Sequence, residues 1–389
     1  MSDSEPSEDD SPPTWSQLAE ENRFYFTKNP RLKFTNVERV HFNGGQLTFT
    51  EYDKKDKVVR KMTIKYASTR EGVNWLDNEI LCLQHLSGNE HVVRTIAIKD
   101  ARINLAGTGR DRSYPILALE YLPFGSLLQL RKRATDGRRL IPNRVLWRVF
   151  LCLARQQVGF LFPRRAGPKA PLWREVSSRD FGSGYSGVIE HNALENGNNH
   201  RFRDFSREDD EHGLLPAVVS TDFTRGRLSA NLDDTMYFHL RAIGYFMTSL
   251  ALNVIDEETI EFRGEMRPMT NWQVARLFPE QHIVPQEIES EIPDILWDAD
   301  GIDHELKEVI ARCLALDNLN MITYRNLLVL CEDGARHRDP TEILEMPPDR
   351  EAELTLDGDK KFVRDFILNA DLEADRSILG VQNRWGDMG

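Results

Sequence analysis

The chain has 389 residues, of which 40% are apolar, and a formal net charge of −12. This length fits two or three domains, or one large bilobal unit with tails. The negative charge argues against nucleic acid or an anionic membrane as the main partner, so we expect neither.

The termini and the cysteines indicate a cytoplasmic or nuclear protein. Residues 1–22 are predicted to form a disordered acidic tail, most clearly in "MSDSEPSEDDSPP", which lacks the apolar core of a signal peptide. The most apolar stretch, "AIGYFMTSLALNVI", is too short to cross a bilayer. Four widely spaced cysteines show no zinc-binding spacing, so we expect buried free thiols at Cys82, Cys152, Cys313 and Cys331.

The first third of the chain is predicted to contain most of the strands. Residues 34–68 alternate apolar and polar side chains around a turn that contains glycine, which is typical of antiparallel strands. Residues 74–86 have helical spacing, and residues 115–122 indicate a short buried strand. We therefore expect a small antiparallel-sheet half with one helix over residues 23–120.

The remainder is predicted to be mostly helical, which makes the fold class α+β. Long apolar helices are expected over residues 143–162 and 235–255, and an amphipathic helix capped by Asp303 over residues 303–318. Two inserts, 163–187 and 198–216, are predicted to be loops.

A larger helical half is therefore assigned to residues 121–338. The tail, residues 339–389, contains one amphipathic helix candidate over residues 359–371. Its apolar side is formed by Phe362, Val363, Phe366 and Ile367, and we expect that side to dock on the body of the same chain rather than on a partner.

Lys65 and Glu79 form the first of several motifs whose order along the chain is informative. Lys65 lies in the strand "MTIKYA", and Glu79 lies in the helix that follows. The pair resembles the lysine and the helix C glutamate of protein kinases, in which the glutamate holds the ammonium against the phosphates of ATP. The next strand, "LALEYLPFGSL", resembles the kinase hinge and implies that Leu119 is the gatekeeper and that the backbone of Glu120 and Leu122 faces adenine.

Two further segments resemble the kinase catalytic and metal-binding motifs. "HNALENGN" aligns without a gap with H-R-D-L-x-x-x-N, so that His191 and Asn198 match the family. "STDFTRG" matches D-F-G at Asp222, with Thr224 in place of the glycine. The resemblance implies that Asn198 and Asp222 bind Mg²⁺.

The resemblance covers about residues 34–333 and is closest to the divergent kinase-like proteins of filamentous fungi. It implies a bilobal fold, with helix C in the small lobe and a larger helical lobe.

The sequence departs from the family at the phosphate loop and at the catalytic base. Gly44 and Gly45 remain of the glycine-rich loop, but Phe42 and Leu47 occupy two of its glycine positions and would obstruct the phosphates or be tucked aside. Ala193 replaces the base, and Glu195 replaces a lysine that touches the transferred phosphate. Losing a base costs ~10²- to 10⁴-fold, and losing an electrostatic contact costs ~10²- to 10³-fold.

The segment after Asp222 departs from the family as well. It is short and lacks the A-P-E motif, and His239 stands where the family has an aspartate that braces the catalytic loop. These absences agree with one another and suggest a lost catalytic apparatus.

Three functions follow from this pattern. The first is a pseudokinase with a regulatory or scaffolding role toward a protein partner, which binds ATP and Mg²⁺ through the retained residues. The second is an active, atypical phosphotransferase acting on a protein or a small molecule, in which Glu190, Asn192 or Glu195 orients the acceptor hydroxyl. The third is an interaction module that binds no nucleotide.

Overall fold

The computed structural model describes residues 15–40, 44–96, 102–104, 113–163, 175, 188–194, 196–204, 212–253, 262, 264–269, 286–337 and 356–369. Phe42 and Glu195 lie outside the described residues. The described chain divides into two compact units, one up to Leu83 and from Arg94 to Tyr121, the other from Gln84 to Val93 and from Leu122 onward. Because the first is built on an antiparallel sheet and the second is mainly helical, the predicted α+β class is confirmed.

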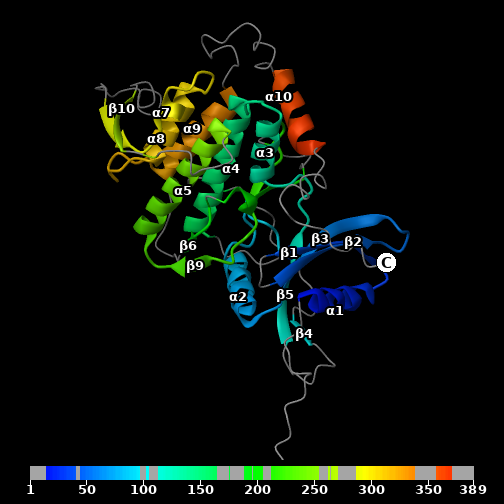
Figure 1. Ribbon diagram of the computed structural model, residues 1–389. Coiled ribbons are helices and arrows are strands. Elements are labelled where there is room, and N and C mark those ends of the chain that lie inside the picture. Colours follow the sequence, from blue (N-terminus) through cyan, green and yellow to red (C-terminus); the bar gives the residue numbers. More distant parts are fainter. Residues whose placement is uncertain are drawn as a thin grey trace, which may run out of the picture. The chain divides into compact units, whose positions relative to one another are not determined.

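The first unit contains a five-stranded sheet in which every neighbouring pair is antiparallel (Figure 1). The predicted strands over residues 34–68 and 115–122 are present. In spatial order the strands are β1 (Leu32–Val40), β2 (Gly44–Tyr52), β3 (Val58–Ala67), β5 (Ser113–Glu120) and β4 (Arg102–Asn104).

A helix that the sequence did not reveal covers part of this sheet. Helix α1 (Trp15–Thr27) packs against β1 and β2 and buries Leu18, Ala19 and Phe26 among the apolar side chains of the strands. It begins within residues 1–22, which were expected to be disordered. The acidic and Ser/Pro-rich composition ends near Thr14, and the apolar residues that follow are stabilised as a helix by packing on the sheet.

Helix α2 (Arg70–His85) follows β3 directly and includes the predicted helix over residues 74–86. It buries Leu76, Cys82 and Leu83 on one side. Glu79 lies on the same buried side, although its side chain is acidic. A buried carboxylate requires a charged or hydrogen-bonding partner, which identifies this helix as part of a candidate site.

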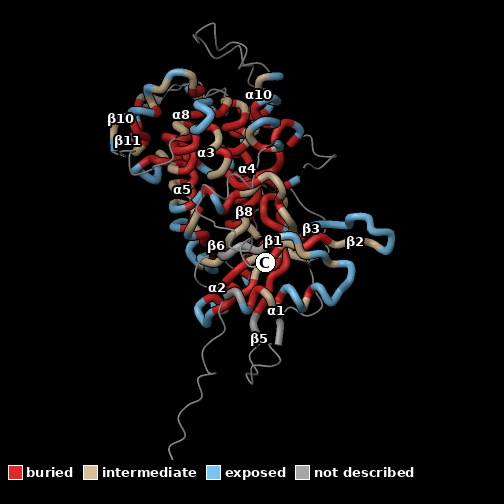
Figure 2. Tube along the Cα trace, turned by 45° about the vertical axis from the view of Figure 1, so that its right-hand side comes forward, coloured by how far each residue is buried: buried red, intermediate tan, exposed pale blue. Residues whose placement is uncertain are grey.

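The second unit is organised around helix α4 (Asn143–Leu161), which is buried along nearly its whole length (Figure 2). It packs against α5 (Leu232–Leu252) and α9 (Tyr324–His337) (Figure 1). The predicted helices over residues 143–162 and 235–255 are therefore present as α4 and α5. Helix α8 (His304–Cys313) lies within the predicted helix over residues 303–318. The other α-helices in the described part of this unit are α3 (Leu127–Asp136), α7 (Asp294–Trp297) and α10 (Leu356–Val363).

Three short antiparallel ladders complete the described part of the second unit. They pair β6 (Val188–His191) with β9 (Gly226–Ser229), β7 (His200–Phe202) with β8 (Val218–Ser220), and β10 (Glu265–Met269) with β11 (Gln286–Ser290). Strand β7 lies inside the insert 198–216, which was expected to be a loop. Its backbone hydrogen bonds go to β8, a partner that periodicity over three residues cannot reveal.

The predicted C-terminal helix is present and docks within its own unit. It consists of α10 followed by a π-helical turn, Arg364–Leu368. Phe362, Val363 and Ile367 are buried in the core of the second unit, and Phe366 packs against it. The docking face is the predicted one.

All four cysteines are buried and none forms a disulfide, as expected. Over the described residues, no helix combines the length and the apolar character needed to cross a bilayer.

Candidate functional site

Lys65 and Glu79 form a buried ion pair in the first unit. The Lys65 Nζ atom donates to Glu79 Oε1 at 2.7 Å, with 13% of the lysine side chain and none of the glutamate side chain exposed. Strand β3 supplies the lysine and helix α2 supplies the glutamate, so the two elements are joined electrostatically. The contact predicted from the sequence is therefore present.

Gly44 and Gly45 lie at the start of β2, beside β3. A Cβ atom on Gly44 would lie 2.2 Å from the Tyr66 carbonyl oxygen, and one on Gly45 would lie 2.3 Å from the Tyr66 hydroxyl. Close packing on Tyr66 is thus enough to require glycine at both positions. Leu47, two residues later, is buried against the sheet core, so it is tucked aside.

Of the three predicted hinge residues, two are buried and one is hydrogen-bonded to Arg94. Leu119 and Leu122 are buried. The Glu120 amide donates to the Arg94 carbonyl at 3.0 Å, and its carboxylate accepts from the Arg94 amide at 2.8 Å. The Glu120 N–H is therefore already used within the first unit.

Asn198 and Asp222 approach each other in the second unit. The β7–β8 ladder pairs His200 with Ser220, and the Thr221 amide donates to the Asn199 carbonyl at 2.9 Å. Asn198 and Asp222 follow at the same end of this ladder. The structure thus places the main chains of the two predicted metal ligands next to each other.

Each of these two residues is oriented by a hydroxyl group. The Asn198 Oδ1 atom accepts from the Ser126 hydroxyl at 3.2 Å. The Asp222 Oδ1 atom accepts from the Thr224 hydroxyl at 2.8 Å and from the Thr224 amide at 3.0 Å. Thr224, at the position where the kinase resemblance leads us to expect glycine, therefore holds the carboxylate in place.

The loop around Ala193 is closed by its own hydrogen bonds. The Asn199 side chain donates to the Ala193 carbonyl at 3.0 Å, and the His200 ring donates to the Leu194 carbonyl at 2.8 Å. Gly197 packs so closely on Phe246 that a Cβ atom would lie 2.9 Å from its ring. The segment keeps a defined shape although the side chain at position 193 carries no base.

The possible acceptor-orienting residues next to Ala193 already have partners. Glu190 forms an ion pair with Arg227 at 2.7 Å, across the β6–β9 ladder. The Asn192 amide donates to the Arg225 carbonyl at 3.2 Å. Glu190 and Asn192 therefore serve the local structure.

His239 contacts the predicted catalytic loop. Its Nε2 atom accepts a hydrogen bond from the His191 amide at 3.0 Å. The His191 ring lies against Phe160 and Phe223, and the His239 ring lies against Phe160. Both phenylalanines are buried. This aromatic cluster anchors the segment that carries Asp222 to helices α4 and α5.

Burial keeps both histidine rings neutral. It lowers the pKa of His191 to about 4, against the opposing attraction of Asp222. Burial, together with the nearby His191, lowers the pKa of His239 to about 3. A neutral His239 can accept the hydrogen bond from the His191 amide, as its geometry requires.

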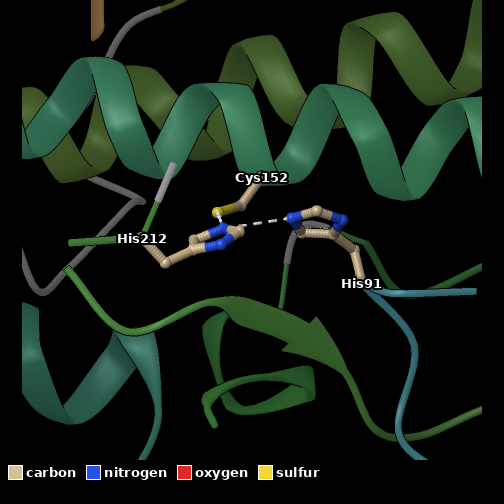
Figure 3. A group of neighbouring side chains, drawn as sticks. All are labelled: His91, Cys152 and His212. Carbon is tan, nitrogen blue, oxygen red and sulfur yellow. Dashed lines mark hydrogen bonds between the residues drawn. The ribbon is translucent and has the colours of Figure 1, made fainter. Parts of the chain in front are cut away.

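A second group of polar side chains, which the sequence did not reveal, lies buried in the second unit. We call His91, Cys152 and His212 the His/Cys cluster (Figure 3). The His212 Nε2 atom lies 3.4 Å from Cys152 Sγ and 3.3 Å from His91 Nε2. The three residues are about sixty residues apart from one to the next, and His212 lies in an insert expected to be a loop, so no local spacing could indicate them.

Charges within the His/Cys cluster oppose the effect of burial. Burial alone would raise the pKa of the Cys152 thiol, but His212 and His91 lower it to about 6. Burial alone would lower the pKa of His91, but Glu175 and Cys152 raise it to about 10. The cluster is therefore strongly polar in an apolar interior.

No protein-family model matches the chain, and no curated protein is significantly similar to it in sequence. Function must therefore be argued from the residues and their contacts. The residues that resemble kinase site residues are Lys65 and Glu79 in the first unit and Asn198 and Asp222 in the second unit. The His/Cys cluster is a separate group within the second unit.

Proposed function

We propose that this chain is a protein-kinase-like protein of bilobal fold that binds ATP but does not transfer phosphate. In this proposal it is a pseudokinase that regulates or scaffolds a protein partner. The observation that carries the proposal is the buried ion pair between Lys65 and Glu79. A lysine fixed by a fully buried carboxylate is the arrangement that holds nucleotide phosphates in kinases.

The arrangement of Asn198 and Asp222 supports the nucleotide part of the proposal. Both lie at one end of the β7–β8 ladder and are oriented by hydroxyl groups. An amide oxygen and a carboxylate are suitable ligands for Mg²⁺, which would accompany the nucleotide. In the proposal, Lys65 binds the phosphates and these two residues bind the metal ion.

The absence of phosphate transfer is proposed from the residues around the same loop. Ala193 offers no base, which costs ~10²- to 10⁴-fold. Glu195 would place a negative charge where the family has a cation, and loss of one such contact costs ~10²- to 10³-fold. From a typical kinase rate of about 1–100 s⁻¹, Ala193 alone would slow the reaction without abolishing it, and the two losses together leave little turnover.

Strand β9 is followed closely by α5, which begins at Leu232. This leaves little chain for a platform that would bind a peptide substrate. This short connection supports the proposal of a pseudokinase. It also favours a second candidate, a phosphotransferase that acts on a small molecule.

A thermal shift assay tests nucleotide binding. ATP with Mg²⁺ or Mn²⁺ should raise the melting temperature of the wild-type chain, because a ligand that binds only the folded state stabilises it. Lys65→Ala should abolish this increase. Lys61→Ala is the matched control, since Lys61 is an exposed lysine on the same strand, and it should keep the increase.

Removing Lys65 alone leaves Glu79 buried without that cation, which is expected to destabilise the fold by about 3–5 kcal/mol. The double variant Lys65→Met with Glu79→Leu removes both charges and serves as the second test. It too should show no response to ATP. An unchanged melting temperature of the wild type at saturating ATP would contradict nucleotide binding and favour an interaction module instead.

A further inference from the structure

Three side chains from separate parts of the second unit place their donor atoms together. His91 comes from the segment after α2, Cys152 from the middle of α4, and His212 from the segment before β8 (Figure 3). All three are buried, and their ligand atoms lie within 4.8 Å of one another. Two imidazole nitrogens and a sulfur are the donors that zinc prefers.

The His212 Nε2 atom faces two other donor atoms of the group, Cys152 Sγ and His91 Nε2. An imidazole nitrogen has either one N–H or one lone pair, so it must share that one group between these two neighbours. A cation among the three donors would accept a lone pair from each of them.

The distances fit a tetrahedral zinc ion. With Zn–N bonds of about 2.0–2.1 Å and a Zn–S bond of about 2.3 Å, tetrahedral angles separate two nitrogens by about 3.3 Å and a nitrogen from a sulfur by about 3.6 Å. The corresponding distances in the structure are 3.3 Å and 3.4 Å. Two of the three donor separations therefore match, and the third, between His91 and Cys152, lies within 4.8 Å.

Glu175 orients His91 toward the cluster. Its Oε2 atom lies 2.7 Å from His91 Nδ1, and its Oε1 atom accepts from the His91 amide at 3.1 Å. Arg155 in turn donates to the Glu175 carbonyl. A carboxylate on the outer nitrogen of a histidine fixes the tautomer in which Nε2 carries the lone pair, as in carboxylate–histidine–zinc sites.

On these grounds we propose that His91, Cys152 and His212 bind a zinc ion and that Glu175 holds the His91 ring through its Nδ1 atom. The proposal goes beyond the proposed nucleotide binding and does not depend on it. Complete burial argues against a cysteine that attacks a dissolved substrate. A thiolate with two imidazoles favours zinc over Mg²⁺ or Ca²⁺.

Such an ion would link three segments that are distant in the sequence. His91 is part of a segment held to β8, where the Ser220 amide donates to the His91 carbonyl at 3.0 Å. Cys152 would connect this segment and His212 to the central helix α4. The expected role is therefore to stabilise the second unit, because binding that requires the folded site adds to folding stability.

The test is the metal content of the full-length chain. The purified protein is treated with a chelator, reloaded with Zn²⁺ alone, freed of unbound metal and measured by elemental mass spectrometry. The wild type should retain one zinc ion per chain, and Cys152→Ala and His212→Ala should lose it. Cys313→Ala, which truncates another buried cysteine, is the matched control and should retain it.

Replacement by Co²⁺ gives a readout on the wild type alone, which does not depend on whether the variants fold. Ligation by Cys152 predicts a thiolate-to-cobalt charge-transfer band and the visible spectrum of a tetrahedral ion. A wild type that keeps no metal after reloading would overturn the proposal. So would a cobalt spectrum without the thiolate band, or zinc retained equally in Cys152→Ala and His212→Ala.

Discussion

At the residue scale, His239 shows how a substitution can preserve a structural role. The kinase resemblance places an aspartate at this position, and its absence suggested lost bracing of the loop. In the structure, His239 accepts a hydrogen bond from the His191 amide. His239 therefore holds the loop through a neutral ring instead of a carboxylate. Its identity is thus no evidence that the catalytic residues have been lost.

Replacing His239 with alanine is expected to destabilise the fold. The buried His191 amide would lose its acceptor, which costs about 1–3 kcal/mol. The melting temperature should fall by several degrees, as measured by calorimetry. Phe238→Ala, on the same helix at a side chain that is 59% exposed, should change it little. Equal effects of the two substitutions would show that the hydrogen bond does not matter.

The buried histidines predict sensitivity to acid. Burial lowers the pKa of His200 to about 4, in part against its hydrogen bond to Leu194, and lowers those of His191 and His239 similarly. Between about pH 6.5 and pH 4 the unfolded chain binds protons that these folded rings do not. The free energy of unfolding contributed by these groups therefore falls as the pH falls through this range.

His200→Gln isolates one of these groups, since glutamine can still donate to the Leu194 carbonyl. Urea denaturation at several pH values should show a smaller loss of stability below pH 6.5 in this variant than in the wild type. His85→Gln, at a histidine that is not buried, should follow the wild type. Parallel pH profiles of wild type and His200→Gln would refute the assignment.

Residue contacts could be predicted from the sequence where they are local or follow a known order. Lys65 and Glu79 lie on adjacent elements, and their resemblance to the lysine and helix C glutamate of kinases predicted the ion pair. His91 and Glu175 are 84 residues apart in the chain, and their contact depends on how the helical unit folds. No periodicity carries such information.

At the element scale, the C-terminal helix is an integral part of the second unit. Phe366 packs on Gly137, where a Cβ atom would lie 3.0 Å from its ring, and Arg144 lies 3.6 Å from Asp359. Ile367 is 1% exposed. The apolar side of this helix could be predicted from helical periodicity in the sequence. The surface on which it packs could not be predicted, because that surface is formed by residues far away in the chain.

Ile367→Ala should therefore lower the free energy of unfolding by about 2–5 kcal/mol, the usual effect of truncating a buried aliphatic side chain. Chemical denaturation measures this change. Lys360→Ala, at an exposed position on the same helix, is the control. If Ile367→Ala left stability unchanged, the helix would be available to a partner instead of being part of the core.

Elements with strong periodicity were predicted well, and those formed by tertiary contacts were not. The amphipathic and apolar helices α2, α4, α5 and α8 matched their expected ranges closely. Helix α1 was missed because its apolar residues follow an acidic tail and are stabilised by the sheet. Strand β7 was missed because three residues carry no pattern of their own.

At the scale of the whole molecule, composition and element order predicted the α+β class, an antiparallel sheet followed by a helical unit. The glycines of β2 illustrate what the sequence leaves open. Gly44 and Gly45 suggested a phosphate loop, yet packing on Tyr66 already requires glycine there. A glycine can be needed either for a phosphate loop or for close packing, and only the contacts in the structure distinguish these two reasons.

We propose that the chain binds ATP and does not transfer its phosphate. The decisive measurement is the release of ADP from ATP with Mg²⁺ or Mn²⁺, on a preparation whose nucleotide binding has been measured. The wild type should release ADP no faster than Asp222→Ala. Turnover that is lost in Asp222→Ala but persists in Glu195→Ala would contradict it and identify an active phosphotransferase.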